Sequence, residues 1–173
     1  MNYSIEQLKN MIENEKQLPP DFNQWYLKID EKGYTIAHLA AEYNCLPPNF
    51  DRWYIRNNKL EWTVAHEAAI YRHLPPYFNQ WELADINGWT LAHVAARSGQ
   101  LPSDFNQWEL ADKDGWTVAH LAARYGHLPS NFNQWELTDK FGRIVAREAY
   151  ECDNLPPNFD RWDLIKKYQE DQS

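Results

Sequence analysis

The chain has 173 residues, a mass of 20.6 kDa and a net charge of −8, with 43 % hydrophobic and 15 % aromatic residues. This composition is sufficient for a packed core and excludes a globally disordered chain, while the acidic balance argues against direct binding to a nucleic-acid backbone. No apolar run approaches the roughly 20 residues of a membrane span, no secretory signal is visible, and two cysteines are too few for a disulfide scaffold.

The first 17 residues predict an N-terminal capping helix. Ser4 is a good helix N-cap, and Ile5, Leu8, Met11 and Ile12 follow at spacings that place them on one side of a helix. Charged residues fall largely on the other side. We expect residues 1–17 to cover the exposed face of the repeats that follow.

A first repeated string, Leu-Pro-x-x-Phe-x-x-Trp, occurs six times, in steps of 28, 28, 27, 27 and 27 residues. It contains all ten prolines and six of the nine tryptophans. Proline is tolerated in the first turn of a helix, and Leu128, Phe132 and Trp135 then share one helical face. The string therefore predicts a short helix in each copy. The copies begin at Leu18, Leu46, Leu74, Leu101, Leu128 and Leu155.

A second string, Gly-Trp-Thr-x-Ala-His-x-Ala-Ala, lies between copies of the first. It is clear at 33–41, 61–69, 88–96 and 115–123, and has diverged at 142–150. Thr117 can cap a helix, with His120 facing back toward the cap as in a capping box. The alanines favour helix and allow close approach of neighbours. Gly99 and Gly126 stand where such helices would end.

The period of 27–28 residues is typical of a stack in which each unit packs against its neighbours. We predict an all-α helical solenoid of about five helix-turn-helix repeats, with short hairpin or turn connections and capping helices. The repeat array is expected over residues 18–165, followed by a polar C-terminal tail over residues 166–173.

The pattern resembles the ankyrin repeat. The stretch Asp112-Lys-Asp-Gly-Trp-Thr-Val-Ala-His-Leu-Ala-Ala-Arg-Tyr-Gly-His-Leu128 follows that family's signature almost position for position. The period is shorter than the family's 33 residues, its Thr-Pro-Leu-His lacks the Pro-Leu here, and the Leu-Pro-x-x-Phe-x-x-Trp string replaces the usual second helix. The resemblance implies a short ankyrin-like variant that binds through its tips and first helices.

The ladder of His38, His66, His93 and His120 invites a metal-binding interpretation. Stacked helices lie roughly 8–10 Å apart, whereas zinc holds nitrogen ligands at about 2.0–2.1 Å. Neighbouring histidines therefore cannot share an ion, and we expect no metal. The ankyrin resemblance implies instead a capping role and hydrogen bonds between repeats.

No catalytic signature is present: the chain has no phosphate-cradling glycine loop and no nucleophile motif. We expect neither enzymatic activity nor a cofactor. The repeated aromatic residues are more typical of a core than of a ligand site. Cys45 and Cys152 lie about four repeats apart, too far for a disulfide.

The candidate partner-binding residues are those at which the repeats differ, because each copy has the same structural requirements. Such positions cluster at the predicted tips and at the helix ends, where Tyr and Arg are frequent interface residues. The tips contribute Lys32, Arg56, Asn58, Lys59, Ile86, Lys113, Asp114, Lys140 and Phe141, and the helix ends contribute Tyr43, Tyr71, Arg72, Arg97, Arg124 and Tyr125.

We expect a cytoplasmic, monomeric, non-enzymatic protein-interaction module whose rigid surface loses little entropy when it binds a protein partner. No nucleic acid or membrane is expected to bind directly. An alternative is an acidic inhibitor or decoy that blocks a nucleic-acid-binding host protein, as a phage or symbiont factor would. Strong salt dependence of binding would favour the decoy.

Overall fold

The computed structural model describes residues 3–170, with the side chains of residues 3–166, and divides into two compact units. Unit 1 is Met1–Asn87 and unit 2 is Gly88–Ser173. Within the described residues every regular element is helical, and the only β-type pairings are isolated bridges. The predicted all-α class is therefore confirmed. No helix in this part of the chain is long and apolar enough to cross a membrane.

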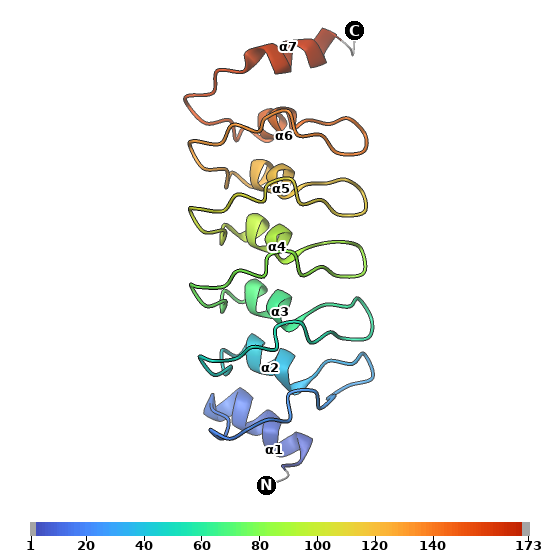
Figure 1. Cartoon of the computed structure of the whole chain (residues 1–173), viewed down its shortest axis with the longest axis vertical. Coiled ribbons are helices and arrows are strands. Elements are labelled where there is room, and N and C mark those ends of the chain that lie inside the picture. The colour runs from blue at the N-terminus through green and yellow to red at the C-terminus, as the bar shows by residue number, and fades with distance from the viewer. Residues whose placement is uncertain (1–2, 171–173) are drawn as a thin grey trace. The chain divides into compact units, whose positions relative to one another are not determined.

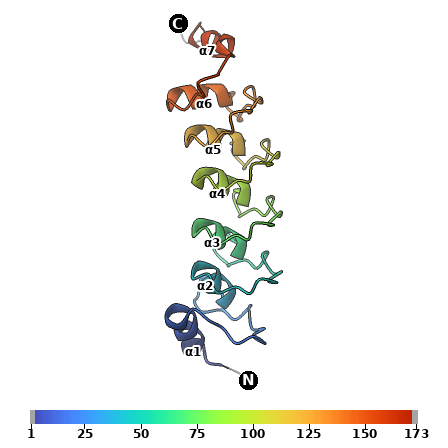
Figure 2. The ribbon, with the colours of Figure 1, turned by 90° about the vertical axis from the view of Figure 1, so that its left-hand side faces the viewer.

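Each unit contains a short series of helices. In unit 1 these are α1 (Ile5–Asn10), the π-helical turn η1 (Met11–Glu15), α2 (Ile36–Glu42) and α3 (Val64–Ile70). In unit 2 they are α4 (Leu91–Ser98), α5 (Val118–Arg124), α6 (Val145–Glu151) and α7 (Trp162–Glu170). Within each unit, successive helices lie side by side (Figure 1), and Figure 2 shows irregular segments along the opposite side.

The helix expected near the N-terminus is present as α1 followed by η1. Ser4 caps α1 in a capping box with Gln7, and Leu8 and Ile12 are fully buried. Residues 1–2 of the predicted capping segment lie outside the described residues. At the other end, α7 continues through Glu170, so the first residues of the predicted polar tail are helical, and residues 171–173 are not described.

The helices α2 to α5 begin with the predicted capping box, whereas α6, in the diverged copy, begins after Ile144 without a side-chain cap. In α5, Thr117 Oγ1 accepts a hydrogen bond from the His120 backbone N–H at 3.3 Å, which completes the predicted capping box. The N–H groups of Val118 and Ala119, the first two residues of α5, donate to the carbonyls of Leu110 and Trp108. Helix starts leave such N–H groups without partners inside the helix, so the preceding segment of the chain acts as a backbone cap.

The predicted second helix is wrong. In each Leu-Pro-x-x-Phe-x-x-Trp string, Phe donates its N–H to the carbonyl three residues earlier, as Phe132 does to Pro129 at 2.9 Å. A second turn of the same type follows, in which Leu137 donates to Gln134 at 3.2 Å. Two successive turns therefore replace the predicted helix.

These turns still bury the residues that the helical spacing selected. Phe132 and Trp135 are buried, and their rings meet edge to face with centroids 4.9 Å apart. Within each unit the next Phe packs on the preceding Trp, as Phe50 does on Trp25 at 5.1 Å. The helices add a layer of fully buried alanines beside this aromatic ladder, for example Ala119 and Ala122 in α5.

The tips between Trp and Thr are tight turns that pack on one another. Gly115 and Gly142 occupy equivalent tips with φ of +73° and +77°, a region that strains residues with a Cβ atom. A Cβ on Gly115 would lie 2.6 Å from the backbone nitrogen of Lys140, whereas one on Gly142 would meet nothing within 4 Å. The next tip therefore packs directly against Gly115, whereas no described residue packs on that side of Gly142.

We expect Gly142→Ala to destabilise the protein by about 1–2 kcal/mol, the cost of left-handed backbone alone. Gly115→Ala should cost roughly twice as much, because the Lys140 backbone must also move. Urea denaturation followed by circular dichroism would measure both. Equal losses for the two variants would show that the tips do not pack as described.

Candidate functional site

The repeated histidines have a structural role at the three positions where hydrogen-bond partners of both ring nitrogens are defined. His120 Nδ1 accepts from the Thr117 N–H at 3.4 Å, and Nε2 donates to the Arg143 carbonyl at 2.9 Å. His38 and His93 make the same bonds, donating at 3.1 and 2.9 Å to tryptophan carbonyls of the next tip. The expected capping role and bonds between repeats are thus confirmed for these residues.

Burial lowers the pKa of His38 to about 4, and it also lowers the pKa of His120. Both rings are therefore neutral at pH 7. Among the side chains that the structure describes, those of residues 3–166, no group of three or more His, Cys, Asp or Glu is arranged to hold a metal ion. Cys45 and Cys152 are free thiols.

A second set of hydrogen bonds between neighbouring copies was not predicted from the sequence. His73 Nδ1 donates to the Ala41 carbonyl at 2.9 Å, and His127 does the same to Ala96 at 2.8 Å. Asn154 takes this role with the Ala123 carbonyl at 3.1 Å. Each side chain ties the end of the preceding helix to the next copy. The available signal in the sequence was a His, Asn or Gln directly before five of the six Leu-Pro pairs.

The helix face of unit 1 carries two carboxylates held by aromatic donors. The Tyr34 hydroxyl donates to Glu42 at 3.1 Å, the Trp62 indole to Glu67 at 3.1 Å and the Tyr71 hydroxyl to Glu42 at 3.3 Å. Neither carboxylate pairs with Lys or Arg among the described residues. Burial raises the pKa of Glu67. Of this cluster the sequence analysis selected only Tyr71.

Several predicted tip residues of unit 1 hold the tips together. The Arg56 guanidinium donates to the Glu61 carboxylate at 3.1 Å and to the Ala84 carbonyl of the next tip at 2.7 Å. The Asn58 N–H donates to the Lys32 carbonyl at 2.8 Å. Arg56 and Asn58 therefore have a structural role that is sufficient to explain them.

The remaining predicted residues of unit 1 are separated. Tyr43 ends α2 and carries the Lys16 ammonium 3.9 Å from its ring centroid. Ile86 is 44 % exposed, and Lys59 is exposed at a tip. Arg72 follows α3 in a left-handed conformation with φ of 63°. These side chains do not line one common cavity.

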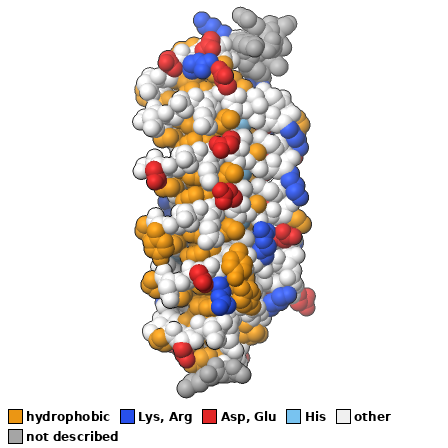
Figure 3. Space-filling model, in the orientation of Figure 1, with side chains coloured by type: hydrophobic (Ala, Val, Ile, Leu, Met, Phe, Trp, Pro, Cys, Tyr) orange, Lys and Arg blue, Asp and Glu red, His pale blue; other side chains and the backbone are white. Residues whose placement is uncertain are grey.

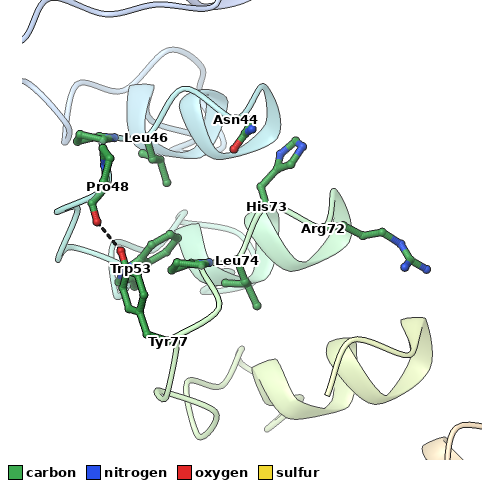
Figure 4. Close-up of a pocket in the computed structure, with 10 residues that line it drawn as sticks. Asn44, Leu46, Pro48, Trp53, Arg72, His73, Leu74 and Tyr77 are labelled. Carbon is green, nitrogen blue, oxygen red and sulfur yellow. Dashed lines mark hydrogen bonds between the residues drawn. The ribbon is translucent and has the colours of Figure 1, made fainter. Parts of the chain in front are cut away.

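A cavity of about 280 Å³ in unit 1 lies between two neighbouring Leu-Pro segments. Figure 4 shows Pro48, Trp53, Leu74 and Tyr77 gathered along it, with the Tyr77 hydroxyl donating to the Pro48 carbonyl. Arg72 contributes to the lining but its guanidinium points away from these apolar residues (Figure 4). The sequence analysis did not select the apolar residues, which belong to the repeated string.

Unit 2 brings five predicted residues together. They line an open cavity of about 350 Å³ together with Trp89, Trp116, Leu121, Asp112 and Arg143. The five residues come from helix ends and from neighbouring tips: Arg97, Asp114, Arg124, Tyr125 and Phe141. Among the surfaces that the structure describes, this one agrees best with the predicted partner-binding residues.

Two arginines of the unit 2 cavity lie against the ring of one tryptophan. The guanidinium carbons of Arg124 and Arg143 lie 4.7 and 4.5 Å from the Trp116 ring. Arg124 Nε donates to the buried carboxylate of Glu148 at 2.5 Å, and the hydrogen bond to Glu148 raises the pKa of Arg124 against the opposing effect of burial. The carboxylate therefore fixes the arginine in place.

Arg143 is held in the same way. Its Nε donates to the buried carboxylate of Asp139 at 2.8 Å. Burial alone would raise the pKa of Asp139, but hydrogen bonds from Arg143 and from the Phe141 N–H lower it. Asp139 and Arg143 are thus an ionised pair at pH 7.

The tips beside this cavity expose the other predicted residues of unit 2. Phe141 is 72 % exposed, the highest value among the large hydrophobic side chains of residues 3–166. Lys140 pairs with Asp114 of the preceding tip, and Lys113 is exposed. Tyr125 is 43 % exposed beneath Arg97, whose guanidinium carbon lies 5.8 Å from its ring.

The face seen in Figure 3 bears hydrophobic and uncharged side chains over most of its area, and charged side chains are scattered across it. In unit 1 the exposed aromatics include Tyr26 and Tyr54, which are about half exposed and joined by a hydroxyl contact of 3.1 Å. The sequence analysis did not select these tyrosines, although they differ from the acidic residues at the same position of later copies.

No protein-family model matches this chain, and no curated protein is significantly similar to it.

Proposed function

We propose that the chain is a non-enzymatic protein-interaction module, an ankyrin-like helical solenoid that binds a protein partner through its tips and helix faces. One observation carries this proposal. Positions that serve packing, such as the buried Thr and His of each helix start, hold the same residue in four copies, whereas neighbouring exposed positions differ in charge and size.

The position four residues after the helix-start histidine illustrates the contrast. It holds Glu42 in α2, Ile70 in α3, Arg97 in α4 and Arg124 in α5. Helix formation and packing place the same demands on each copy, so these differences are free to serve recognition. Exposed Tyr, Trp and Arg side chains are also the residues most often found at the centre of protein interfaces.

The acidic-decoy alternative requires a surface with concentrated negative charge. The unit 2 cavity does not provide one, since three arginines line it beside two aspartates. A protein partner recognised through mixed aromatic and charged contacts fits these surfaces better than a basic nucleic-acid site does.

Affinity capture from extracts of the producing cells tests the proposal. The control chain carries Ile86→Ser, Tyr125→Ala and Phe141→Ser, three exposed positions whose replacement should leave the fold intact. We expect one or a few proteins to be retained at 50 mM and at 300 mM salt by the wild-type chain and to be lost from the control. Retention of nothing at either salt would contradict the proposal, and capture that vanishes at high salt with both chains would favour the decoy.

A further inference from the structure

The unit 2 cavity contains hydrogen-bond donors that the protein does not use. A guanidinium has five N–H donors, and Arg124 and Arg143 each use Nε alone, toward Glu148 and Asp139. Their Nη groups have no acceptor among residues 3–166, whose side chains the structure describes, and the guanidinium of Arg97 forms neither a hydrogen bond nor an ion pair there. Three guanidinium groups therefore present free donors at one cavity.

The acidic residues of the same cavity are already engaged. Asp112 accepts hydrogen bonds from the backbone N–H groups of Asp114 and Trp116, at 2.8 and 2.9 Å, and so shapes its own tip. Asp114 pairs with Lys140 of the next tip. Arg124 and Arg143 are charge-paired with Glu148 and Asp139, so the cavity leaves unused the Nη donors of these two residues and the whole guanidinium of Arg97, a set of donors that suits an anionic ligand group.

The arginines are held before any ligand arrives. Arg124 and Arg143 are each anchored by a buried carboxylate and stacked against the Trp116 ring. An arginine fixed in this way loses little side-chain entropy on binding, and its planar fork matches a carboxylate in a bidentate arrangement. The exposed rings of Tyr125 and Phe141 lie along the same cavity and offer an apolar contact.

We propose that this cavity binds a linear segment of the partner protein in which Asp or Glu stands next to a large apolar or aromatic residue. The carboxylate meets the guanidinium groups of Arg97, Arg124 and Arg143, and the apolar side chain packs on Phe141 and Tyr125. The proposal rests on the protein-binding function above and adds the chemistry of the ligand.

Unit 1 has the opposite chemistry at the same repeat positions. Glu42 occupies the position of Arg97 and Arg124, and Glu67 stands with it as a second carboxylate without a cation. A segment rich in Asp and Glu is repelled there, so the preference for carboxylates is confined to unit 2. This contrast provides an internal control within one chain.

Selection of a random heptapeptide phage library on the full-length chain tests the proposal. We expect enriched peptides to combine Asp or Glu with Phe, Trp or Leu, and synthetic copies to bind in fluorescence anisotropy. Arg97→Gln should weaken that binding about tenfold, the usual effect of losing one charged hydrogen-bond pair. Arg97→Lys should recover only part of it, because lysine keeps the charge but lacks the planar fork.

Arg97 suits this test because its side chain is exposed and supports no buried carboxylate. Lys166→Gln, an exposed residue of α7, makes the same change of charge in unit 2 and should leave the affinity unchanged. Phe141→Ser tests the apolar half and should weaken binding severalfold. A drop with Lys166→Gln equal to that with Arg97→Gln would reduce the effect to general electrostatics and overturn the proposal.

The remaining outcomes separate this proposal from the proposed function. Enriched peptides without carboxylates, or peptides that bind Arg97→Gln as tightly as wild type, would overturn the carboxylate site and leave a protein-binding module. Arginine-dependent binding of a labelled ten-residue oligothymidine, with no peptide enriched, would overturn both in favour of a single-stranded nucleic acid.

Discussion

Replacing Trp135 by alanine should lower the free energy of unfolding by about 3–5 kcal/mol. Trp135 is 5 % exposed, and its ring lies edge to face between Phe132 and Phe159, with centroid distances of 4.9 and 5.0 Å. Its removal deletes a large buried side chain and leaves Phe132 and Phe159 with one edge-to-face tryptophan partner each instead of two. Urea denaturation monitored by circular dichroism gives the measurement, because the signal does not depend on tryptophan.

Trp162→Ala is the matched control. Trp162 closes the last copy of the same string, but it is 48 % exposed and contacts the ring of Phe159 alone among described aromatic residues. Its replacement should cost less than half as much as that of Trp135, since less apolar area returns to water. Equal losses would mean that the rings do not stack from copy to copy.

The helix starts could be predicted because their determinants are local. Thr117 and His120 are three residues apart, and the capping box they form requires only helical backbone between them. The αL glycines at the ends of α4 and α5 were predictable for the same reason, since Gly99 and Gly126 each stand three residues after the last alanine of the string. Short-range hydrogen bonds of this kind can be recognised in a single sequence.

The Leu-Pro segments could not be assigned from their spacing. Apolar residues at i, i+4 and i+7 fit one face of a helix, but two successive turns place Phe132 and Trp135 in the core equally well. The choice depends on the ring contacts that the neighbouring copy supplies, such as that of Phe159 on Trp135. Those are properties of packing, which the period alone does not reveal.

The candidate site was predictable only in part. The disagreement among copies drew attention to Arg97, Arg124, Tyr125 and Phe141, which share a cavity in unit 2. It also selected Arg56 and Asn58, which tie neighbouring tips together. A repeat position can differ between copies because packing leaves it free, or because each copy makes a different structural contact there. Geometry is needed to separate the two cases.

Acidification from pH 7 to pH 4.5 should destabilise the protein by about 2–3 kcal/mol through His38 alone. The pKa of His38 is about 4, lowered chiefly by burial, against an ordinary value of 6.5. Between these two values the unfolded chain binds a proton that the folded chain excludes, so stability is complete above pH 6.5 and falls as the pH drops toward 4. The pKa of His120 is also lowered and acts in the same direction.

The hydrogen bonds explain why the folded ring resists protonation. His38 Nε2 donates to the Trp62 carbonyl, so Nδ1 is the acceptor that receives the Thr35 N–H at 3.3 Å. A proton on Nδ1 would oppose that donor inside the core. Glutamine at this position offers one acceptor and one donor without titrating, and it is an accepted partner in a capping box. His38→Gln should therefore lose about 2 kcal/mol less than wild type between pH 7 and pH 4.5 in urea denaturation. An identical pH dependence in the two proteins would assign the acid sensitivity to other groups and remove His38 from the account.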